Sequence, residues 1–365
     1  MAKSSGHSNH LAHFNRQDFR ACLLAWYDAN ARDLPWRARP GAKKRTDPYR
    51  VWVSEIMLQQ TRVAAVIAHY REFLTRFPSV RQLAGAKEAS VLAAWSGLGY
   101  YRRARMLHAA AKAIVRERDG KFPSTADEWR ELPGIGRYTA AAIASIAFKE
   151  AAAVVDGNVK RVVQRITGKW IDGETLWLAA EELLDRDRPG DFNQAMMELG
   201  ATICSVQAPA CLTCPVSGMC ATRGELPEVR KRERQRKREI HYALHCQSGN
   251  GGARVFLVRR PRDASLMAGM WELPEIEAPI ERDQPVLTVR HSITVTDYTV
   301  KVWRSEPFAS SGEWVAVKRL KRVALTGLAR KILQKAEVMA GVRHRSHPKS
   351  RPIVLGADIK EHVGG

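Results

Sequence analysis

The spacing of apolar residues divides the chain into two parts. From Arg16 to about Ala221, apolar residues recur every three or four positions, and the breaks between these stretches carry proline, glycine or helix-capping residues. This period is that of amphipathic helices that pack against one another. The pattern therefore predicts an all-helical domain over residues 16–224.

Local capping residues set the limits of several predicted helices. Asp47 followed by Pro48 predicts a helix that continues to about Arg62, because aspartate caps a helix start and proline favours the first turn. Ser124 to Asp127 has the form of a capping box, with aspartate in place of the usual glutamate. Gly97-Leu98-Gly99 interrupts the periodicity and predicts a turn between helices.

Beyond residue 240 the apolar stretches become short and alternating, which is typical of strands. We expect strands from Tyr242 to Cys246, Ala253 to Val258, Ile293 to Val302 and Trp314 to Val317, and a helix from Thr326 to Met339. The sequence therefore predicts a small α+β domain over residues 240–340.

Charged segments separate and follow these two domains. Residues 225–239 contain an almost continuous basic run, Arg230 to Arg238, which we interpret as an exposed linker. Residues 341–365 are rich in histidine, arginine, proline and glycine, and we expect a basic, disordered tail. The 365 residues carry a formal net charge of +21, which favours a polyanionic partner. Charge alone leaves nucleic acid and an anionic membrane surface both open.

Neither a membrane segment nor a secretory signal is expected. No apolar run approaches the ~20 residues that cross a bilayer. The first segment, Met1 to Phe14, is polar and rich in histidine, whereas a secretory signal has an apolar centre. We therefore expect a cytoplasmic protein.

Four of the six cysteines lie close together in the sequence, at Cys204, Cys211, Cys214 and Cys220. Such crowding is typical of metal ligands and not of a dispersed disulfide framework. Four thiolates satisfy a structural zinc ion. Zinc sites more often use two closely spaced pairs set further apart, and the asymmetric spacing here favours an iron–sulfur cluster. The residues themselves leave both open.

A short glycine-containing turn, Leu132 to Thr139, joins two helical segments. Gly134 and Gly136 permit a tight turn, and the backbone N–H groups at the start of the next helix can hold a phosphate. A Gly-x-Gly turn is weak evidence by itself. In a basic, helical protein it predicts a helix-hairpin-helix that binds the DNA backbone without reading sequence.

Two carboxylates are candidates for acid–base chemistry. Glu55 lies in a predicted helix that is apolar on nearly every side, where burial favours the neutral acid. Asp156 follows an apolar run and precedes a new helix, whose N-terminus favours the ionised form. One protonated and one charged carboxyl form the pair that cleaves glycosidic bonds through a cation-like sugar. For either residue alone, a helix cap or an ion pair is the ordinary interpretation.

The motifs together resemble the MutY family of adenine DNA glycosylases. The resemblance covers residues 16–221, with a weaker match beyond. It rests on segments that occur in order: Leu34 to Trp36, Trp52 to Thr61, Gly97 to Tyr101, Leu132 to Thr139, Asp156 to Val162, Phe192 to Gly200 and the four cysteines. It implies an all-α helix-hairpin-helix glycosylase domain with a [4Fe–4S] cluster loop at 204–220, followed by a small Nudix-like domain. The implied substrate is double-stranded DNA with an A:8-oxoguanine or A:G mispair, and we expect a monomer.

The resemblance also implies roles for single residues. Glu55 is similar to the glutamate that protonates adenine N7 and later assists water, and Asp156 to the carboxylate that stabilises the oxocarbenium-like sugar, with a transient covalent bond as one form of that role. The pocket around them would include Tyr138, Asn158, Arg32, Leu34, Trp36 and Glu198. Contacts to the flipped base and the duplex would come from Gln60, Thr61, Leu98, Tyr100, Gly134 and Gly136, of which Gln60 and Tyr100 would enter the duplex.

Tyr138 distinguishes the chain from endonuclease III-type enzymes. These resemble it through the hairpin and the cysteines, but they carry a lysine at this position, which attacks the sugar and cuts the strand. Tyrosine there predicts base removal without efficient strand cleavage. Lys160 and Lys149 are other lysines that could substitute.

The second domain is similar to the Nudix-like recognition domain of the family, chiefly through Ser265 to Pro274. A Nudix hydrolase needs a helix dense in glutamates to bind magnesium, and the sequence has none, so hydrolysis of nucleotides is not expected. The family's Phe-Ser-His segment, which contacts 8-oxoguanine, aligns with Ile293, Thr294 and Val295. Thr294 keeps a hydroxyl and is the candidate lesion contact, but the lost aromatic and imidazole groups leave the preference for 8-oxoguanine over guanine open.

Three functions are compatible with these features to different degrees. The leading hypothesis is a monofunctional adenine glycosylase. The second is a bifunctional pyrimidine glycosylase and lyase, which Tyr138 opposes. The third is a non-catalytic DNA-binding protein, which would explain the charge, the hairpin and the cysteines but would not require Glu55 together with Asp156.

Overall fold

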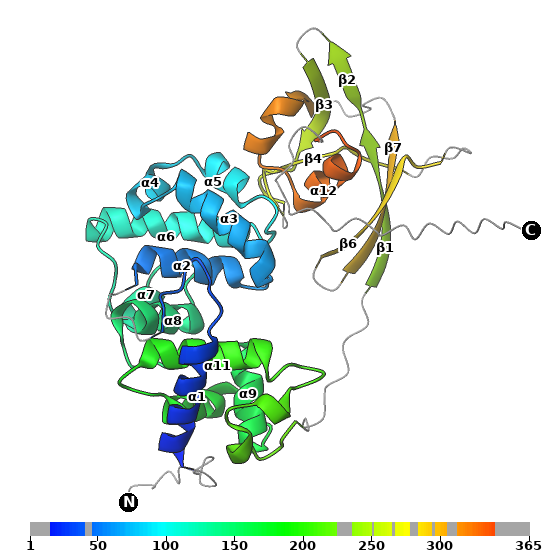
Figure 1. Ribbon diagram of the computed structural model, residues 1–365. Helices are drawn as coiled ribbons and strands as arrows, with labels where there is room; N and C mark the ends of the chain where they lie inside the picture. Colours follow the sequence, from blue (N-terminus) through cyan, green and yellow to red (C-terminus); the bar gives the residue numbers. More distant parts are fainter. Residues whose placement is uncertain are drawn as a thin grey trace, which may run out of the picture.

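Helices form the first part of the chain. The computed structural model describes residues 15–40, 46–224, 236–249, 252–264, 267–277, 284–293, 296–304 and 312–339 (Figure 1). The helices are α1 (Arg16–Asn30), α2 (Pro48–Leu58), α3 (Val63–Arg76), α4 (Val80–Gly85), α5 (Glu88–Trp95), α6 (Arg102–Arg118), α7 (Ala126–Arg130), α8 (Arg137–Phe148), α9 (Gly157–Thr167), α10 (Gly173–Leu183) and α11 (Pro189–Thr202). Short 3-10 helices follow at Cys211–Thr213 and Ser217–Met219.

Side-chain caps fix the starts of the helices that matter for the site. The Asp47 carboxylate accepts a hydrogen bond from the backbone N–H of Tyr49, and Pro48 is the first residue of α2. The expected helix start is therefore confirmed, although α2 ends at Leu58 and not near Arg62. The backbone leaves the helical conformation at Gln59, whose ψ is +116°, and the turn continues at Gln60, whose φ is +53°.

The capping box before α7 lies one residue later than predicted. Thr125 and Glu128 form the reciprocal pair, with the Thr125 hydroxyl on the N–H of Glu128 and the Glu128 carboxylate on the N–H of Thr125. The prediction of Ser124 with Asp127 was therefore wrong. Two overlapping four-residue patterns occur here, and the true box is the one with the longer glutamate, which reaches back to the cap.

The helical part contains two hydrophobic cores. One core is built by α2 to α8 around Trp52, Trp95 and Trp129. The other is built by α1 and α9 to α11, with part of α8, around Phe19 and Phe192. Figure 1 shows α8 and α11 between the two groups of helices, so residues on α2, α8 and α11 can face one another.

Strands and one helix form the second part. They are β1 (Arg236–Leu244), β2 (Cys246–Gly249), β3 (Gly252–Arg259), β4 (Trp271–Glu272), β5 (Glu275–Ile276), β6 (Leu287–Ile293), β7 (Thr296–Arg304), β8 (Gly312–Ala316) and α12 (Gly327–Lys335). One sheet has the order β5-β1-β7-β6, with β1 parallel to β7, and the other consists of β2-β3-β4 with β8 on β3. An α+β character is confirmed.

Several boundaries in this part differ from the sequence prediction. The strand expected from Tyr242 to Cys246 is the end of β1 and the start of β2, and the helix expected to reach Met339 ends at Lys335. Residues 236–239, expected in the linker, belong to β1, because their backbone pairs with residues 296–299 of β7 whatever the charge of their exposed side chains. The strand expected from Ile293 to Val302 corresponds to β7, which begins at Thr296, whereas Ile293 is the last residue of the antiparallel strand β6, which was not predicted. Thr294 and Val295 lie outside the described residues, as do the rest of the linker and the tail 341–365.

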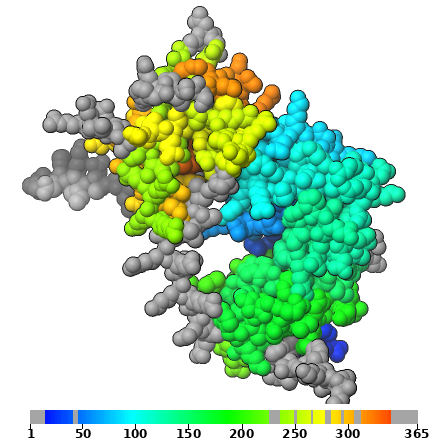
Figure 2. Space-filling view, turned by 180° about the vertical axis from the view of Figure 1, so that it is seen from behind, coloured from blue at the N-terminus to red at the C-terminus, as the bar shows by residue number. Residues whose placement is uncertain are grey.

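The second part packs on the first through α5, α6 and their connecting turn. Met270 and Ala324 extend the first helical core. The hydroxyl of Tyr101 donates to the carbonyl of Leu325 at 2.8 Å, and Nε of Arg330 donates to Oγ of Ser96 at 2.8 Å. Figure 2 shows these surfaces in contact, yellow against cyan. The first of these hydrogen bonds is buried and the second is partly buried, which makes this a defined docking contact.

Among the helices within the described ranges, none is both long and apolar enough to cross a membrane.

Candidate active site

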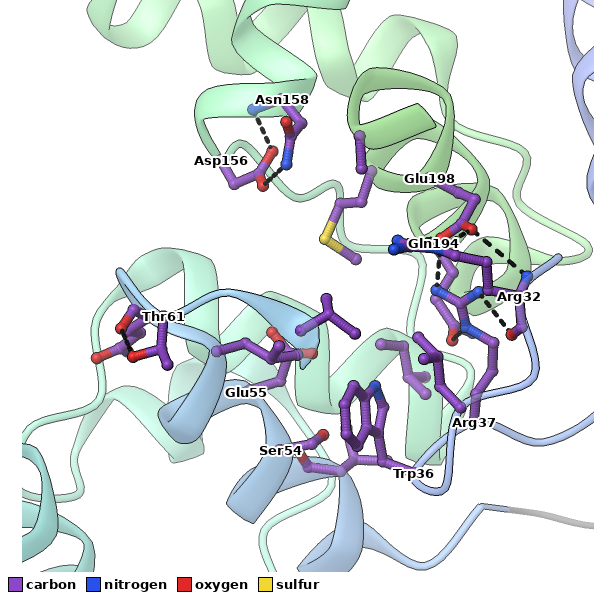
Figure 3. A pocket seen from close by; sticks show the side chains of 18 of the residues that line it. Arg32, Trp36, Arg37, Ser54, Glu55, Thr61, Asp156, Asn158, Gln194 and Glu198 are labelled. Carbon is purple, nitrogen blue, oxygen red and sulfur yellow. Dashed lines mark hydrogen bonds and ion pairs between the residues drawn. The ribbon is translucent and has the colours of Figure 1, made fainter. Parts of the chain in front are cut away.

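A pocket of about 440 Å³ opens between the two halves of the helical part (Figure 3). This volume lies in the usual range for sites that enclose a small ligand. Its walls come from α2, α8, α9 and α11 and from the segment before α2. Of the residues predicted from sequence, it brings together Arg32, Leu34, Trp36, Glu55, Gln60, Thr61, Tyr138, Asp156, Asn158 and Glu198.

Glu55 rises from the buried helix α2 and is 5 % exposed. Burial raises the pKa of its carboxyl from 4.5 to about 7, and the charge of Asp156 acts in the same direction. A hydrogen bond from the Tyr138 hydroxyl, 2.8 Å from Oε2, and the charge of Arg37 oppose this shift. Glu55 therefore holds or releases a proton near neutral pH, as a general acid must.

Asp156 faces Glu55 from the opposite wall of the pocket (Figure 3). It is the N-cap of α9, and its Oδ1 accepts from the backbone N–H groups of Asn158 at 2.9 Å and Val159 at 2.7 Å. The Asn158 side-chain amide donates to its Oδ2 at 2.9 Å. Three donors and a helix N-terminus stabilise the negative charge, so the arrangement suits a developing cation in the pocket.

A chain of hydrogen bonds continues from Asp156 to the cysteine loop. The Oδ1 of Asn158 accepts from Nη2 of Arg161 at 2.9 Å, and Nε of Arg161 donates to the carbonyl of Cys204 at 2.8 Å. The cysteine loop thereby helps to fix the orientation of the Asp156 carboxylate.

A buried ion pair closes one end of the pocket. Glu198 on α11 is 1 % exposed and accepts hydrogen bonds from the side chains of Arg32 and Arg37. Burial opposes its charge, but the hydrogen bonds and charges of the two arginines outweigh burial, and the pKa of Glu198 is lowered. Both oxygens of the Glu198 carboxylate are thus hydrogen-bonded to arginines, and the side chain forms part of the pocket wall.

No lysine lines this pocket within the described part of the chain. Lys160 binds Asp172, with 2.6 Å between Nζ and Oδ2. Lys149 lies in a separate cavity beside Arg188 and Asp191. Neither substitute lysine lines the pocket that holds Glu55 and Asp156.

A second, larger cleft of about 1370 Å³ lies between the two parts of the molecule. Gln60, Leu98, Tyr100 and Gly134 from the predicted set line it, together with residues of α12 and β6. Tyr100 is 48 % exposed, so it is not a core aromatic residue. Gln60 lines both the pocket and the cleft, which makes the two spaces neighbours.

The glycine turn borders this cleft and has a steric reason for its composition. Gly134 has a φ of +75°, and a Cβ there would lie 2.4 Å from Cβ of Met106. Gly136 is the N-cap of α8, and no described side chain caps the helix. The first N–H groups of α8 are therefore available to a phosphate oxygen.

The four cysteines of the loop line one small cavity and form no disulfide among themselves. A positively charged side chain contacts one of these cysteines. Nη1 of the buried Arg165 lies 3.0 Å from Sγ of Cys204. Within the described ranges, no three His, Cys, Asp or Glu side chains converge as ligands of a single metal ion. Four thiol side chains around one cavity are a donor set that a zinc ion or an iron–sulfur cluster can use.

Several pocket residues carried no role in the sequence prediction. Arg37, Gln194 and Met197 line the pocket, and Arg37 bonds both Gln194 and Glu198. Gln194 lies one helical turn before Glu198, so its position on α11 could have indicated it, whereas Met197 directly precedes Glu198 and its position gives no such signal. Arg37 carried no such pattern.

Comparison with known proteins agrees with this geometry. Residues 53–182 match the family model described as HhH-GPD superfamily base excision DNA repair protein. The adenine DNA glycosylase of Mus musculus is 42% identical over 321 residues, with 73% of this chain and 62% of that protein covered. The enzyme of the same name from Schizosaccharomyces pombe is 32% identical over 336 residues, covering 75% and 73%. A solved thermostable thymine-DNA glycosylase, 29% identical, superposes with a TM-score of 0.52 over 57% of this chain and 96% of its own.

The helical part is thus a helix-hairpin-helix fold of the base-excision repair type, which confirms that expectation. The chain belongs to the adenine DNA glycosylase family. It spans about three-fifths of the length of the mouse relative.

Proposed function

We propose that this chain is a monofunctional DNA glycosylase that removes adenine from A:8-oxoguanine and A:G mispairs, acting as a monomer. The observation that carries the proposal is the buried Glu55, hydrogen-bonded to Tyr138 and facing Asp156 across a pocket of nucleoside size. A non-catalytic DNA-binding protein would have no use for a carboxyl with a pKa near 7 in this position.

In the proposed reaction Glu55 supplies the proton. With a pKa of about 7, a large share of Glu55 is protonated at neutral pH. Transfer of this proton to N7 of the extruded adenine lets the base leave with the electron pair of the glycosidic bond. The resulting carboxylate then accepts a proton from the water that adds to the sugar, which restores the acid.

Asp156 would stabilise the positive charge that develops on the sugar. Its carboxylate is held by Asn158 and by the start of α9, so little reorganisation is needed when the charge appears. Arg32, Leu34, Trp36 and Glu198 would form the wall around the base.

Strand cleavage is not part of the proposed activity. A lyase needs an amine to attack the sugar carbon, and Tyr138 stands where that amine would be. The absence of lysine from the described lining of the pocket supports hydrolysis by water.

The larger cleft would hold the duplex. Gln60, Thr61, Leu98 and Tyr100 would contact the bases around the site of extrusion, with Gln60 and Tyr100 inserted. The hairpin with Gly134 and Gly136 would bind phosphate through the N–H groups of α8.

The four cysteines would hold a [4Fe–4S] cluster that stabilises the loop at 204–220. Arg165 would offset part of the negative charge of the thiolates. Replacement of Cys214 by serine should lower iron content and visible absorbance together. Full retention of iron in that variant, or zinc in place of iron in the purified protein, would contradict the assignment.

The second domain would recognise the base opposite adenine and is proposed to be Nudix-like. A mixed sheet with β1 parallel to β7 and α12 beside it supports the assignment. Thr294 is the candidate contact to 8-oxoguanine on sequence grounds.

The test uses isosteric variants of the two carboxylates. Glu55→Gln and Asp156→Asn should bind mispaired DNA about as tightly as the parent and release no adenine in single-turnover assays. Near-normal release by either variant would refute the assigned chemistry.

A further inference from the structure

Two segments of the larger cleft hold non-glycine residues in the left-handed backbone region. Gln60 has a φ of +53° and Tyr100 a φ of +47°. Such conformations are uncommon outside glycine, asparagine and aspartate, and they persist when the surroundings hold them. Residues 58–61 and 98–100 are far apart in sequence, so a side chain that contacts both would set their relative position.

Arg103 makes these contacts. Its Nη1 donates to the carbonyls of Ile56 and Met57, each at 3.0 Å, and to the carbonyl of Gln59. These are carbonyls at the end of α2, which the helix itself leaves without partners. The positive charge also suits the C-terminal end of a helix.

The other nitrogen of the same guanidinium reaches the second segment. Nη2 lies 3.1 Å from Oγ1 of Thr61, 3.2 Å from the carbonyl of Leu98 and 3.3 Å from that of Gly99. The guanidinium carbon lies 5.4 Å from the centre of the Tyr100 ring. The planar guanidinium of Arg103 therefore joins residues 58–61 to residues 98–100 and contacts the exposed ring of Tyr100.

The Arg103 guanidinium is occupied by contacts within the protein. Both terminal nitrogens are hydrogen-bonded to protein oxygens. Burial lowers the pKa of Arg103 to about 10, which leaves the side chain charged at neutral pH. The neighbouring Arg102 is exposed and lines the same cleft, and its guanidinium has no hydrogen bond to another side chain or carbonyl within the described ranges.

We infer that Arg103 is a positioning residue that holds Gln60 and Tyr100 in the conformation in which they enter the duplex, so that the target base is extruded quickly. The inference rests on the proposed function. It assigns Arg103 no contact with the substrate and no part in proton transfer.

The experiment measures extrusion separately from chemistry. A duplex with 2-aminopurine opposite 8-oxoguanine reports extrusion by fluorescence in stopped flow, in a Glu55→Gln background that blocks cleavage. Arg103→Met should slow the fluorescence change by about 10- to 100-fold. When Glu55 is intact, Arg103→Met should slow single-turnover adenine release by the same factor. In the pH profile of that rate, the midpoint of the decline at alkaline pH should stay unchanged.

Two further variants separate positioning from charge and from folding. Arg102→Met should weaken DNA binding and reduce its salt dependence, with an extrusion rate at saturating enzyme close to that of the parent. Arg103→Lys keeps the charge but cannot bridge both segments, so it should remain slow, and it serves as the test if Arg103→Met does not fold. A parent-like extrusion rate in Arg103→Lys would overturn the inference. A parent that releases no adenine would instead refute the proposed function.

Discussion

The hydroxyl of Tyr138 lies 2.8 Å from Oε2 of Glu55, and it opposes the effect that burial has on this carboxyl. Burial alone favours the protonated acid, whereas the hydrogen bond favours the carboxylate. The balance leaves the pKa of Glu55 near 7. Tyr138 therefore adjusts the proton affinity of the proposed general acid.

Tyr138→Phe should move the alkaline decline of the adenine-release rate, where Glu55 loses its proton, to higher pH. The variant removes the hydrogen bond that lowers the pKa of Glu55, so that pKa rises above about 7 and the acid stays protonated further into the alkaline range. The measurement is the pH dependence of the single-turnover rate of adenine release. A decline that stays in place or moves to lower pH would show that Tyr138 does not act on Glu55 in this way.

Glu55→Gln should stabilise the fold at neutral and alkaline pH. The Glu55 pKa is 4.5 when exposed and about 7 in the fold, so the folded protein binds this proton more tightly. The free energy of unfolding of the parent protein therefore falls as pH rises from 4.5 to about 7, by roughly 3 kcal/mol at 1.36 kcal/mol per pH unit. Glutamine does not titrate and keeps the hydrogen bond with Tyr138.

The measurement is the thermal midpoint of both proteins between pH 4.5 and pH 8. The increase in thermal midpoint of Glu55→Gln over the parent should be near zero at pH 4.5, grow up to about pH 7 and remain constant at higher pH. A pH-independent difference would mean that the Glu55 pKa is not raised in the fold.

Glu198→Gln should destabilise the protein far more than loss of an exposed ion pair. It leaves Arg37, whose side chain is 9% exposed, beside a neutral partner. Breaking a buried pair costs about 3–5 kcal/mol. Asp28→Asn is the control, since its pair with Arg188 is partly exposed, at 43% and 31%, and contributes about 1 kcal/mol or less. Equal shifts in the denaturant midpoint for the two variants would contradict the assigned burial.

Tyr101→Phe should reduce discrimination between mispairs without affecting the chemistry. It removes one of the two buried hydrogen bonds to the carbonyl of Leu325 that dock the second domain on the first, the other being donated by Ser96. If this domain recognises 8-oxoguanine, the ratio of release rates for A:8-oxoguanine over A:G should fall toward one, while the A:G rate stays close to that of the parent. An unchanged ratio would separate lesion recognition from this contact.

Local features of the fold could be predicted from the sequence because the interacting groups are close along the chain. Asp47 and Asp156 cap helices through N–H groups two or three residues away, and both starts follow from the residue types. The capping box at Thr125 was missed by one residue because two overlapping patterns satisfy the same rule. The β6–β7 hairpin was missed because an alternating pattern does not show where a strand reverses.

Contacts between distant segments could not be predicted. Arg37 bonds Gln194 and Glu198, 157 and 161 positions away, and Arg103 bonds residues more than 40 positions earlier. Neither arginine differs in local sequence from the many others in this basic chain. Their roles follow from the packing of α6 and α11 against α2 and the segment before it.

The most direct test of the central claim is single-turnover base release by the full chain on duplexes with A opposite 8-oxoguanine, A opposite G, and a matched A·T control, each read before and after alkali. The account predicts adenine release from both mispairs and not from the control, with strand breaks that appear after alkali and not before. Release of no adenine, or strand cleavage without alkali at the rate of base loss, would contradict it.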